Sequence, residues 1–366
     1  MLESFFNPQS VAVVGVSKDT TKLSALVFQN LLDAGFKGEL FAVNPRYAGE
    51  TIYGKPCVAA LKDITNPLDL VVVLVPVART MAVIDDAIEN GAKNISVITA
   101  GFGEVGNHEL EDAIAEKCRT NGINLLGPNC LGHIATYNHL NASFADGFPK
   151  PGPVAFISQS GAYCSAIMDW AKEKGIGFSH FISIGNKALL AEDTLLNALK
   201  DDPDTKAFVF YLESLKNGPA FLEAVRNVSQ TKPVVIMEPG KSQKAQAASL
   251  SHTGSLAPNY RVLEIALKNA GAIQAYNTRE LFGLLELLQS CRHTEFDGPL
   301  AVLTNAGGVG VLTSDLCEEA GIDLKRPSDR MIDVLKQHLP AESAFGNPID
   351  IIGDAKADRY ETALDL

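Results

Sequence analysis

The chain has 366 residues, of which 46% are hydrophobic and 20% charged, and its formal net charge is −12. This composition is typical of a globular protein with two or three core-forming domains, and it excludes a disordered chain. The acidic balance and the lack of any Lys/Arg run argue against binding to nucleic acid or to a membrane surface.

The cysteines and the N-terminus indicate a cytoplasmic protein without a metal site. The six cysteines are scattered and show neither Cys-x-x-Cys nor metal-ligand spacing, so we read them as reduced thiols. The first residues carry no basic segment followed by a long apolar core, as a signal peptide would. The strongest apolar run, residues 70–78, is too short to span a bilayer.

An apolar strand, a glycine-containing turn and a helix follow one another three times along the chain. These units lie at residues 10–17, 154–162 and 300–310. Strands and helices alternate between them, with the further strands expected at 39–44, 70–75, 94–99, 124–126, 177–184, 207–213 and 233–237. Continuous β-branched runs suit parallel strands buried on both faces. The pattern therefore predicts an α/β protein with doubly wound parallel sheets.

Two loop-rich stretches, 129–152 and 290–299, suggest the domain boundaries. We predict a first domain at 1–128, a linker at 129–150, a second domain at 151–290 and the start of a third at 298–366. The third unit stops shortly after a candidate strand at 348–352 and is too short for a complete doubly wound domain. We therefore expect the chain to be a fragment of a longer protein.

The first turn is a candidate anion site, because ligands bind at the carboxyl ends of parallel strands. It carries Gly15 and Ser17, Lys22 and Ser24 follow, and the next strand ends at Asn44. There is no Gly-x-Gly-x-x-Gly and no acidic residue to hold a ribose diol, which argues against NAD. The turn therefore predicts a site for a phosphate-bearing ligand other than NAD.

Other strand ends of this first domain add further candidates for the same ligand. They are Val75-Pro76, Gly101-Phe102 and Asn129-Cys130. Gly101 permits a close approach of the backbone to a ligand, although a simple turn would use it equally well.

The second turn has the composition of a cradle for inorganic phosphate. Ser158, Ser160 and Gly161 lie between an apolar strand and a helix. A hydrolase nucleophile elbow is excluded, because Gly-x-Ser-x-Gly and an oxyanion element of the His-Gly-Gly-Gly type are both missing.

Residues 248–257 contain one histidine, His252, among hydroxyl side chains and without any charged residue. A neutral imidazole is a good nucleophile for phosphorus, and hydroxyl and N–H groups such as those of Gly254 and Ser255 can hold phosphate oxygens. The alternative is an ordinary polar loop. Glu213, at the end of an apolar strand, is either a capping or salt-bridge carboxylate or the group that fixes the tautomer of His252.

These turns, in this order, resemble the NDP-forming acyl-CoA synthetases, and most closely the ADP-forming acetate–CoA ligases, which are relatives of succinyl-CoA synthetase. The resemblance covers essentially the whole chain. Two departures concern local loop shape, Ala188 where many relatives have Asp and Pro258 where Gly is usual. The matching segments are 10–17, 101–104, 127–132, 158–162, 185–187, Glu213, 251–257, 305–308 and 347–350.

The resemblance implies a Rossmann-like CoA-binding domain, then a flavodoxin-like ligase domain with a phosphohistidine, then an incomplete second one. It implies that His252 is phosphorylated with the help of Glu213. It also implies contacts with CoA and phosphate: Gly15–Ser17 with the CoA phosphates, Val75-Pro76 and Gly101-Phe102 along its path, Asn129 and Cys130 near its thiol end, and Ser158, Ser160 and Gly161 with phosphate.

The implied reaction interconverts acyl-CoA, ADP and phosphate with a carboxylic acid, CoA and ATP through acyl phosphate and phosphohistidine. The acid is acetate or another small carboxylic acid. The family pairs this region with an ATP-grasp domain or subunit, which binds ADP or ATP with Mg²⁺, in homo-oligomers or heterotetramers. One alternative is a CoA-sensing region of a lysine acetyltransferase, a group that lacks the histidine. The other is a non-catalytic nucleotide-binding module.

Overall fold

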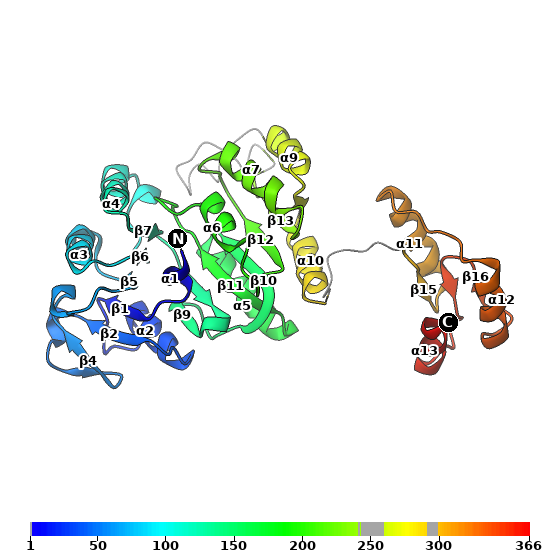
Figure 1. The fold of residues 1–366 in the computed structure, drawn as a ribbon, viewed down its shortest axis with the longest axis horizontal. Helices are drawn as coiled ribbons and strands as arrows, with labels where there is room; N and C mark the ends of the chain where they lie inside the picture. The colour runs from blue at the N-terminus through cyan, green and yellow to red at the C-terminus, as the bar shows by residue number, and fades with distance from the viewer. Residues whose placement is uncertain (1, 241, 243–259, 291–298) are drawn as a thin grey trace. The chain divides into compact units, whose positions relative to one another are not determined.

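The computed structural model describes residues 2–240, 242, 260–290 and 299–366 (Figure 1). It divides the chain into two units, Met1–Thr294 and Glu295–Leu366. The first unit contains two seven-stranded sheets, and the second contains a three-stranded sheet. The predicted α/β class with parallel sheets is confirmed.

The first sheet is parallel apart from its edge strand β3. Every residue of the central strands β1 and β5 is buried, which is why the two segments are valine-rich and almost entirely apolar rather than alternating between apolar and polar residues. In spatial order the strands are β3 (Thr51–Ile52), β4 (Lys55–Val58), β2 (Glu39–Val43), β1 (Ser10–Val14), β5 (Leu70–Val73), β6 (Asn94–Val97) and β7 (Asn124–Leu126).

Helices cover both faces of this sheet. One face packs against α3 (Val77–Asn90) and α4 (His108–Thr120), and the other against α2 (Leu23–Asp33). Short helical turns complete the domain: α1 (Glu3–Phe6), η1 (Pro45–Tyr47), η2 (Leu61–Asp63) and η3 (Gly103–Val105).

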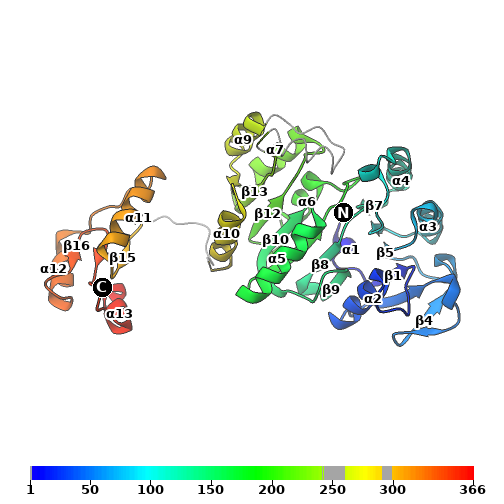
Figure 2. The same ribbon diagram turned by 180° about the vertical axis from the view of Figure 1, so that it is seen from behind.

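The second sheet has five parallel strands and two antiparallel ones at one edge. In spatial order its strands are β14 (Ile273–Gln274), β13 (Val234–Met237), β12 (Ala207–Tyr211), β10 (Lys150–Ser158), β11 (Gly177–Ser183), β8 (Gly132–Ala135) and β9 (Leu140–Ser143). One face packs against α5 (Gly161–Lys174) and α10 (Thr278–Ser290), and the other against α6 (Glu192–Leu199), α7 (Gly218–Val228) and α9 (Tyr260–Asn269) (Figures 1 and 2).

Residues 129–150 differ from the predicted linker. They contain β8, the turn η4 (Thr136–Asn138) and β9, which extend the second sheet beyond β11. The sequence of this segment predicts a polar loop because several of its side chains are polar, but in the structure these side chains are buried and form hydrogen bonds inside the protein. The His133 ring nitrogen Nε2 is 3.1 Å from the Phe5 carbonyl oxygen, and the Ser143 hydroxyl donates to Asn141.

The two sheets of the first unit share a hydrophobic core. One buried cluster includes Phe28 of α2, Leu140 of β9 and Leu196 of α6. Asn30, also on α2, donates to the carbonyl oxygens of Ser143 and Ala145 at 2.9 Å each. These buried contacts hold the first domain against the second, so side chains from both can form one site.

The second unit forms a small three-stranded sheet with three helices. Its strands are β15 (Leu303–Thr304), β16 (Ala344–Phe345) and β17 (Ile349–Asp350). The glycine-rich turn after β15 leads into α11 (Gly307–Glu319), as the third strand–turn–helix pattern predicts. The other helices are α12 (Asp329–His338) and α13 (Ala357–Asp365).

Candidate functional site

Both large sheets bring their candidate residues to a topological switch point. β1 lies between β2 and β5, and β10 lies between β11 and β12, so the strand order reverses between β1 and β5 and between β10 and β12. Ligands of open α/β sheets bind outside the carboxyl ends of the strands at such points. The turns after β1 and β5 and those after β10 and β12 therefore occupy the expected positions.

The turn after β1 requires glycine at its first position. Gly15 has φ +94°, and a Cβ there would collide with the carbonyl oxygen of Leu74. The backbone of this turn thus lies closer to the strand end after β5 than it could if this position carried a residue with a Cβ atom.

The other candidates around this turn have different exposures and partners. The hydroxyl of Ser17 accepts from the Asp19 N–H at 3.1 Å, Lys22 is exposed, and Ser24 is buried in the first turn of α2. Asn44 donates to the Val16 carbonyl oxygen at 2.7 Å and so ties the ends of β1 and β2 together. Direct contact of these residues with a ligand stays a prediction.

The turns after β5 and β6 lie farther along the same edge. Val75 is half-buried and Pro76 exposed, whereas the Phe102 ring is fully buried in the core behind α3 and α4. The backbone N–H groups of Gly101 and Phe102 donate to the carboxylate of Glu104, which shapes this turn from within. Only the backbone of Phe102 can therefore line a ligand path here.

The turn after β10 is built from its own hydroxyl groups. The fully buried Ser158 hydroxyl donates to the Ser160 carbonyl oxygen at 2.9 Å, and the Ser160 hydroxyl caps α5 by accepting from the Tyr163 N–H at 3.3 Å. The N–H groups of Gly161 and Ala162, the first of the helix, have no partner among the described residues. A helix N-terminus of this kind binds anions, as a phosphate cradle requires.

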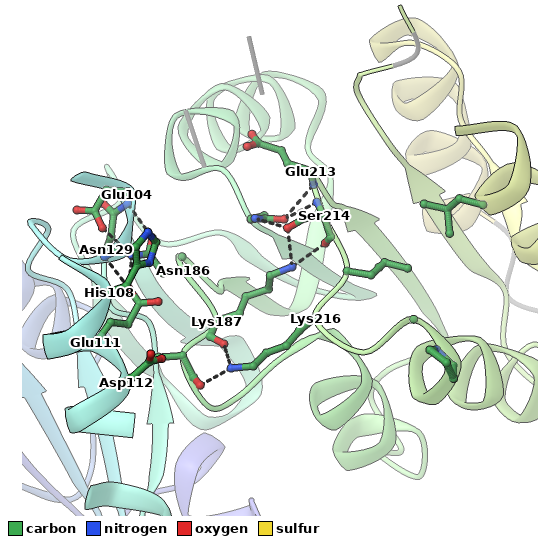
Figure 3. A pocket seen from close by; sticks show the side chains of 18 of the residues that line it. Glu104, His108, Glu111, Asp112, Asn129, Asn186, Lys187, Glu213, Ser214 and Lys216 are labelled. Atoms are coloured by element: carbon green, nitrogen blue, oxygen red, sulfur yellow. Dashed lines mark hydrogen bonds between the residues drawn. The ribbon is translucent and has the colours of Figure 1, made fainter. Parts of the chain in front are cut away.

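A pocket of about 680 Å³ opens where the two domains of the first unit meet (Figure 3). Its walls come from η3 and α4 of the first domain and from the strand ends and helices of the second. Two of the predicted site residues, Glu213 and Asn129, line it. Polar residues line it together with an apolar wall of Leu215, Pro219, Leu222, Val262, Leu263 and Ala266.

Gln159 holds the strand end that carries Glu213. Its side-chain oxygen accepts from the backbone N–H groups of Glu213 at 2.9 Å and of Ser214 at 3.1 Å. Because Gln159 belongs to the turn after β10, this side chain links the predicted phosphate cradle directly to the predicted partner of the histidine.

A buried ion pair supports the same strand end from the other side. The ammonium group of Lys187 lies 3.4 Å from the carboxylate of Glu192, and both side chains are almost completely buried. Lys187 also donates to the Ser214 carbonyl oxygen at 2.6 Å, and Glu192 accepts from the Lys216 N–H at 2.7 Å. Burial lowers the pKa of Lys187, whereas the charge of Glu192 opposes that shift.

Asn186 joins the two domains at the rim of the pocket. Its side-chain nitrogen donates to the carboxylates of Glu104 at 2.6 Å and of Glu111 at 2.7 Å, and its oxygen accepts from Asn129 at 3.1 Å. Glu104 also shapes the turn at Gly101. The loop after β11 is therefore bonded to the turn that is predicted to contact CoA.

Cys130 places its thiol in the core rather than in the pocket. Its Sγ lies 3.4 Å from the Val97 carbonyl oxygen, and burial raises the pKa of the thiol to about 12. Only its backbone can then lie near a bound CoA thiol.

We expect Cys130 to resist iodoacetamide at pH 8 in the native protein, because only ~10⁻⁴ of a thiol with this pKa is ionised and the thiolate is the nucleophile. Mass spectrometry of digested protein, alkylated before or after unfolding, checks this. Rapid labelling of the native protein at Cys130 would show that the thiol is accessible.

His252, Gly254 and Ser255 lie outside the described residues, so their roles stay predictions. Sequence reasoning passed over Gln159 and Ser214 as functional residues. The available signal was position alone, since both stand within three residues of the end of a central parallel strand. Lys187 and Asn186 entered only as part of a family-like segment.

Among the helices that the structure describes, none is both long enough and apolar enough to span a membrane. Within the same residues, no group of three or more His, Cys, Asp and Glu side chains is arranged to hold a metal ion.

Three family models together match almost the entire chain. A CoA binding domain matches residues 9–136, a succinyl-CoA ligase like flavodoxin domain matches 151–288, and a ligase-CoA domain matches 300–366.

Curated relatives match over the full chain. It is 39% identical over 367 residues to acetate–CoA ligase [ADP-forming] I of Archaeoglobus fulgidus, covering 100% of this chain and 53% of that protein. It is 35% identical to the alpha subunit of acetate–CoA ligase [ADP-forming] I of Pyrococcus furiosus, covering 99% of this chain and 79% of that subunit. The chain thus spans about half the length of the Archaeoglobus relative and most of the Pyrococcus alpha subunit.

A solved structure is similar throughout. The dinucleotide forming acetyl-coenzyme A synthetase 1 of Ca. Korarchaeum cryptofilum, in complex with phosphate and ADP, superposes with a TM-score of 0.94 at 37% identity. The match covers 99% of this chain and 78% of that one.

Proposed function

The chain belongs to the family of ADP-forming acetate–CoA ligases, and we propose that it is the CoA-binding and phosphohistidine-bearing part of such an enzyme. The observation that carries this proposal is the pocket between the two domains. It joins Glu213 and the turn after β10 to the first domain, whose family model is a CoA binding domain. Acyl-CoA, phosphate, a carboxylic acid and ADP are the proposed substrates.

The proposed reaction is reversible and has three steps. A phosphate oxygen attacks the thioester carbonyl carbon, and the C–S bond breaks to release CoA and acyl phosphate. A nitrogen of His252 then attacks phosphorus, and the P–O bond to the carboxylate breaks, releasing the acid. Finally the phosphoryl group moves from His252 to ADP, giving ATP and restoring the imidazole.

Residues of this chain would act in these steps from different turns of the two domains. The N–H groups at the start of α5, which have no partner within the described part of the chain, would hold phosphate oxygens, and the turn after β1 would approach the CoA phosphates. Glu213 would fix the tautomer of His252 and balance its charge. We propose that Mg²⁺ acts with ADP in an ATP-grasp domain or subunit that works with this chain.

The direct test uses the complete protein with any partner subunit. Incubated with acetyl-CoA, ADP, phosphate and Mg²⁺, it should form ATP, and omission of phosphate should stop ATP formation completely. A CoA-sensing region of an acetyltransferase would bind CoA and form no ATP. Propionyl-CoA and longer acyl-CoA esters, assayed in parallel, identify the preferred acid.

We expect the chain to bind CoA and not NAD, because the turn after β1 lacks the dinucleotide fingerprint and β2 ends in Asn44 rather than in an acidic residue. Titration calorimetry with each ligand measures this. Gly15→Ala should weaken CoA binding by at least about tenfold, since the added Cβ meets the Leu74 carbonyl oxygen. Tight NAD binding without any heat from CoA would contradict the assignment.

A further inference from the structure

Among the residues that line the pocket, Ser214 carries a hydroxyl group that is held by two hydrogen-bond donors. It follows Glu213 at the end of β12 and lines the pocket. Its Oγ lies 3.2 Å from the side-chain nitrogen of Gln159 and 3.3 Å from the ammonium nitrogen of Lys187 (Figure 3). Each of these contacts uses the hydroxyl oxygen as an acceptor.

The orientation of the Gln159 amide is fixed by the backbone. Its oxygen faces the N–H groups of Glu213 and Ser214, and both of these groups can only donate. The opposite orientation would place an NH₂ group against two N–H groups. The nitrogen of Gln159 therefore faces Ser214, and it donates to the hydroxyl oxygen.

Lys187 also acts as a donor towards Ser214. Its ammonium group has three N–H donors and no acceptor, and it lies against the fully buried carboxylate of Glu192. A buried carboxylate without a compensating cation would cost several kcal/mol, so the pair favours the charged lysine. The same ammonium donates to the Ser214 carbonyl oxygen, which prevents the lysine from turning away.

The bonding capacity of the hydroxyl then determines where its proton points. A serine hydroxyl has two acceptor positions and one donor, and the two donors described above occupy both acceptor positions. Among the residues that the structure describes, none accepts the proton of Ser214. We propose that Ser214 is a catalytic residue that donates this hydrogen bond to an anionic oxygen of the substrate in the pocket.

Two features match an oxyanion rather than a neutral ligand. Donation from a cation to Oγ polarises the hydroxyl and strengthens the bond that its own proton makes. The donor also lies beside Glu213, at the strand end that Gln159 ties to the turn after β10, so the oxyanion belongs near both. This inference deepens the proposed function, under which the anionic oxygen is that of phosphate or of the carboxylate, the two halves of acyl phosphate.

The test compares Ser214→Ala with Ser214→Thr in the complete enzyme. Steady-state kinetics give KM for phosphate from acetyl-CoA, ADP and phosphate, and KM for acetate from acetate, CoA and ATP. Loss of a hydrogen bond to a charged group predicts a rise of about tenfold to a hundredfold in one of these constants for Ser214→Ala. KM for CoA should stay unchanged, and Ser214→Thr should restore most of the loss. The affected constant identifies the oxyanion.

A matched control removes a hydroxyl outside the pocket. The Thr120 hydroxyl at the end of α4 donates to carbonyl oxygens of its own helix and accepts from the neighbouring Asn121, so Thr120→Val should change neither constant. A second variant tests the positioning by the ion pair. Lys187→Met combined with Glu192→Gln removes both charges and leaves neither buried alone. It should raise the same KM, and adding Ser214→Ala to it should then have little further effect, because the residues act through one hydroxyl.

The outcomes separate this inference from the proposed function. If the wild-type enzyme makes ATP and Ser214→Ala lowers only kcat, or changes nothing, Ser214 is structural and the inference is wrong. If the wild-type enzyme makes no ATP, the proposed function fails. Binding of inorganic phosphate and of acetate, measured by titration calorimetry for wild type and Ser214→Ala, then decides the inference. If the variant binds each anion with the same affinity as the wild type, the inference is wrong.

Discussion

His252→Ala is expected to abolish both phosphorylation of the protein and ATP formation. The complete wild-type enzyme, incubated with γ-labelled ATP and Mg²⁺, should carry one label that is labile in acid and stable in base, as a phosphoimidazole is. An alanine has no nitrogen to attack phosphorus, and no other histidine of the chain stands in a similar loop of hydroxyl residues. Loss of the nucleophile should lower the turnover number by at least about 10⁴-fold.

The control for this variant is a second histidine. His338, exposed on α12 of the other unit, can be replaced by alanine without an expected effect on labelling or turnover. CoA binding should persist in His252→Ala, because the predicted CoA contacts lie on the first domain. Full labelling of His252→Ala would assign the phosphoryl group to another residue, whereas loss of the label together with CoA binding would indicate misfolding.

The sequence predicted the sheets well because their strands are buried on both faces. β1, β5 and β12 are almost entirely apolar, and the glycines Gly15 and Gly161 mark the turns that follow β1 and β10. The switch points follow from strand order, so the edge at which the candidates gather could be expected. β8 and β9 were missed because their polar side chains are satisfied by distant partners, such as the Phe5 carbonyl oxygen near His133.

The pocket itself could not be predicted, since it depends on pairings between separate segments. Asn186 reads as a turn residue, yet it bonds to two carboxylates of another domain. In the sequence Lys187 and Glu192 are two charged residues five positions apart with no visible relation, yet in the structure they form an ion pair that is almost fully buried. Such roles arise from the packing of the two domains, which leaves no local pattern.

Glu213→Gln is expected to slow phosphohistidine formation by about 10²–10⁴-fold while the protein stays folded. A carboxylate that accepts an imidazole N–H selects the tautomer whose other nitrogen attacks, and it stabilises the cationic ring that forms on phosphorylation. The amide side chain introduced by this substitution has nearly the same shape as the carboxylate of Glu213 but carries no charge. The strand end should hold its position, because Gln159 bonds to the backbone of Glu213 rather than to its side chain.

Single-turnover labelling of His252 measures this effect without contributions from product release. Glu213→Asp should fall between wild type and Glu213→Gln, because the shorter side chain keeps the charge but misplaces the carboxylate. Glu223→Gln, an exposed glutamate on α7, serves as the matched control and should label at the wild-type rate. The Glu213 variants should lose rate with little change in KM for phosphate or for acetate, in contrast to Ser214→Ala, which should raise one of these two constants. Wild-type labelling of Glu213→Gln would reduce Glu213 to a structural carboxylate and leave His252 to be oriented by some other group.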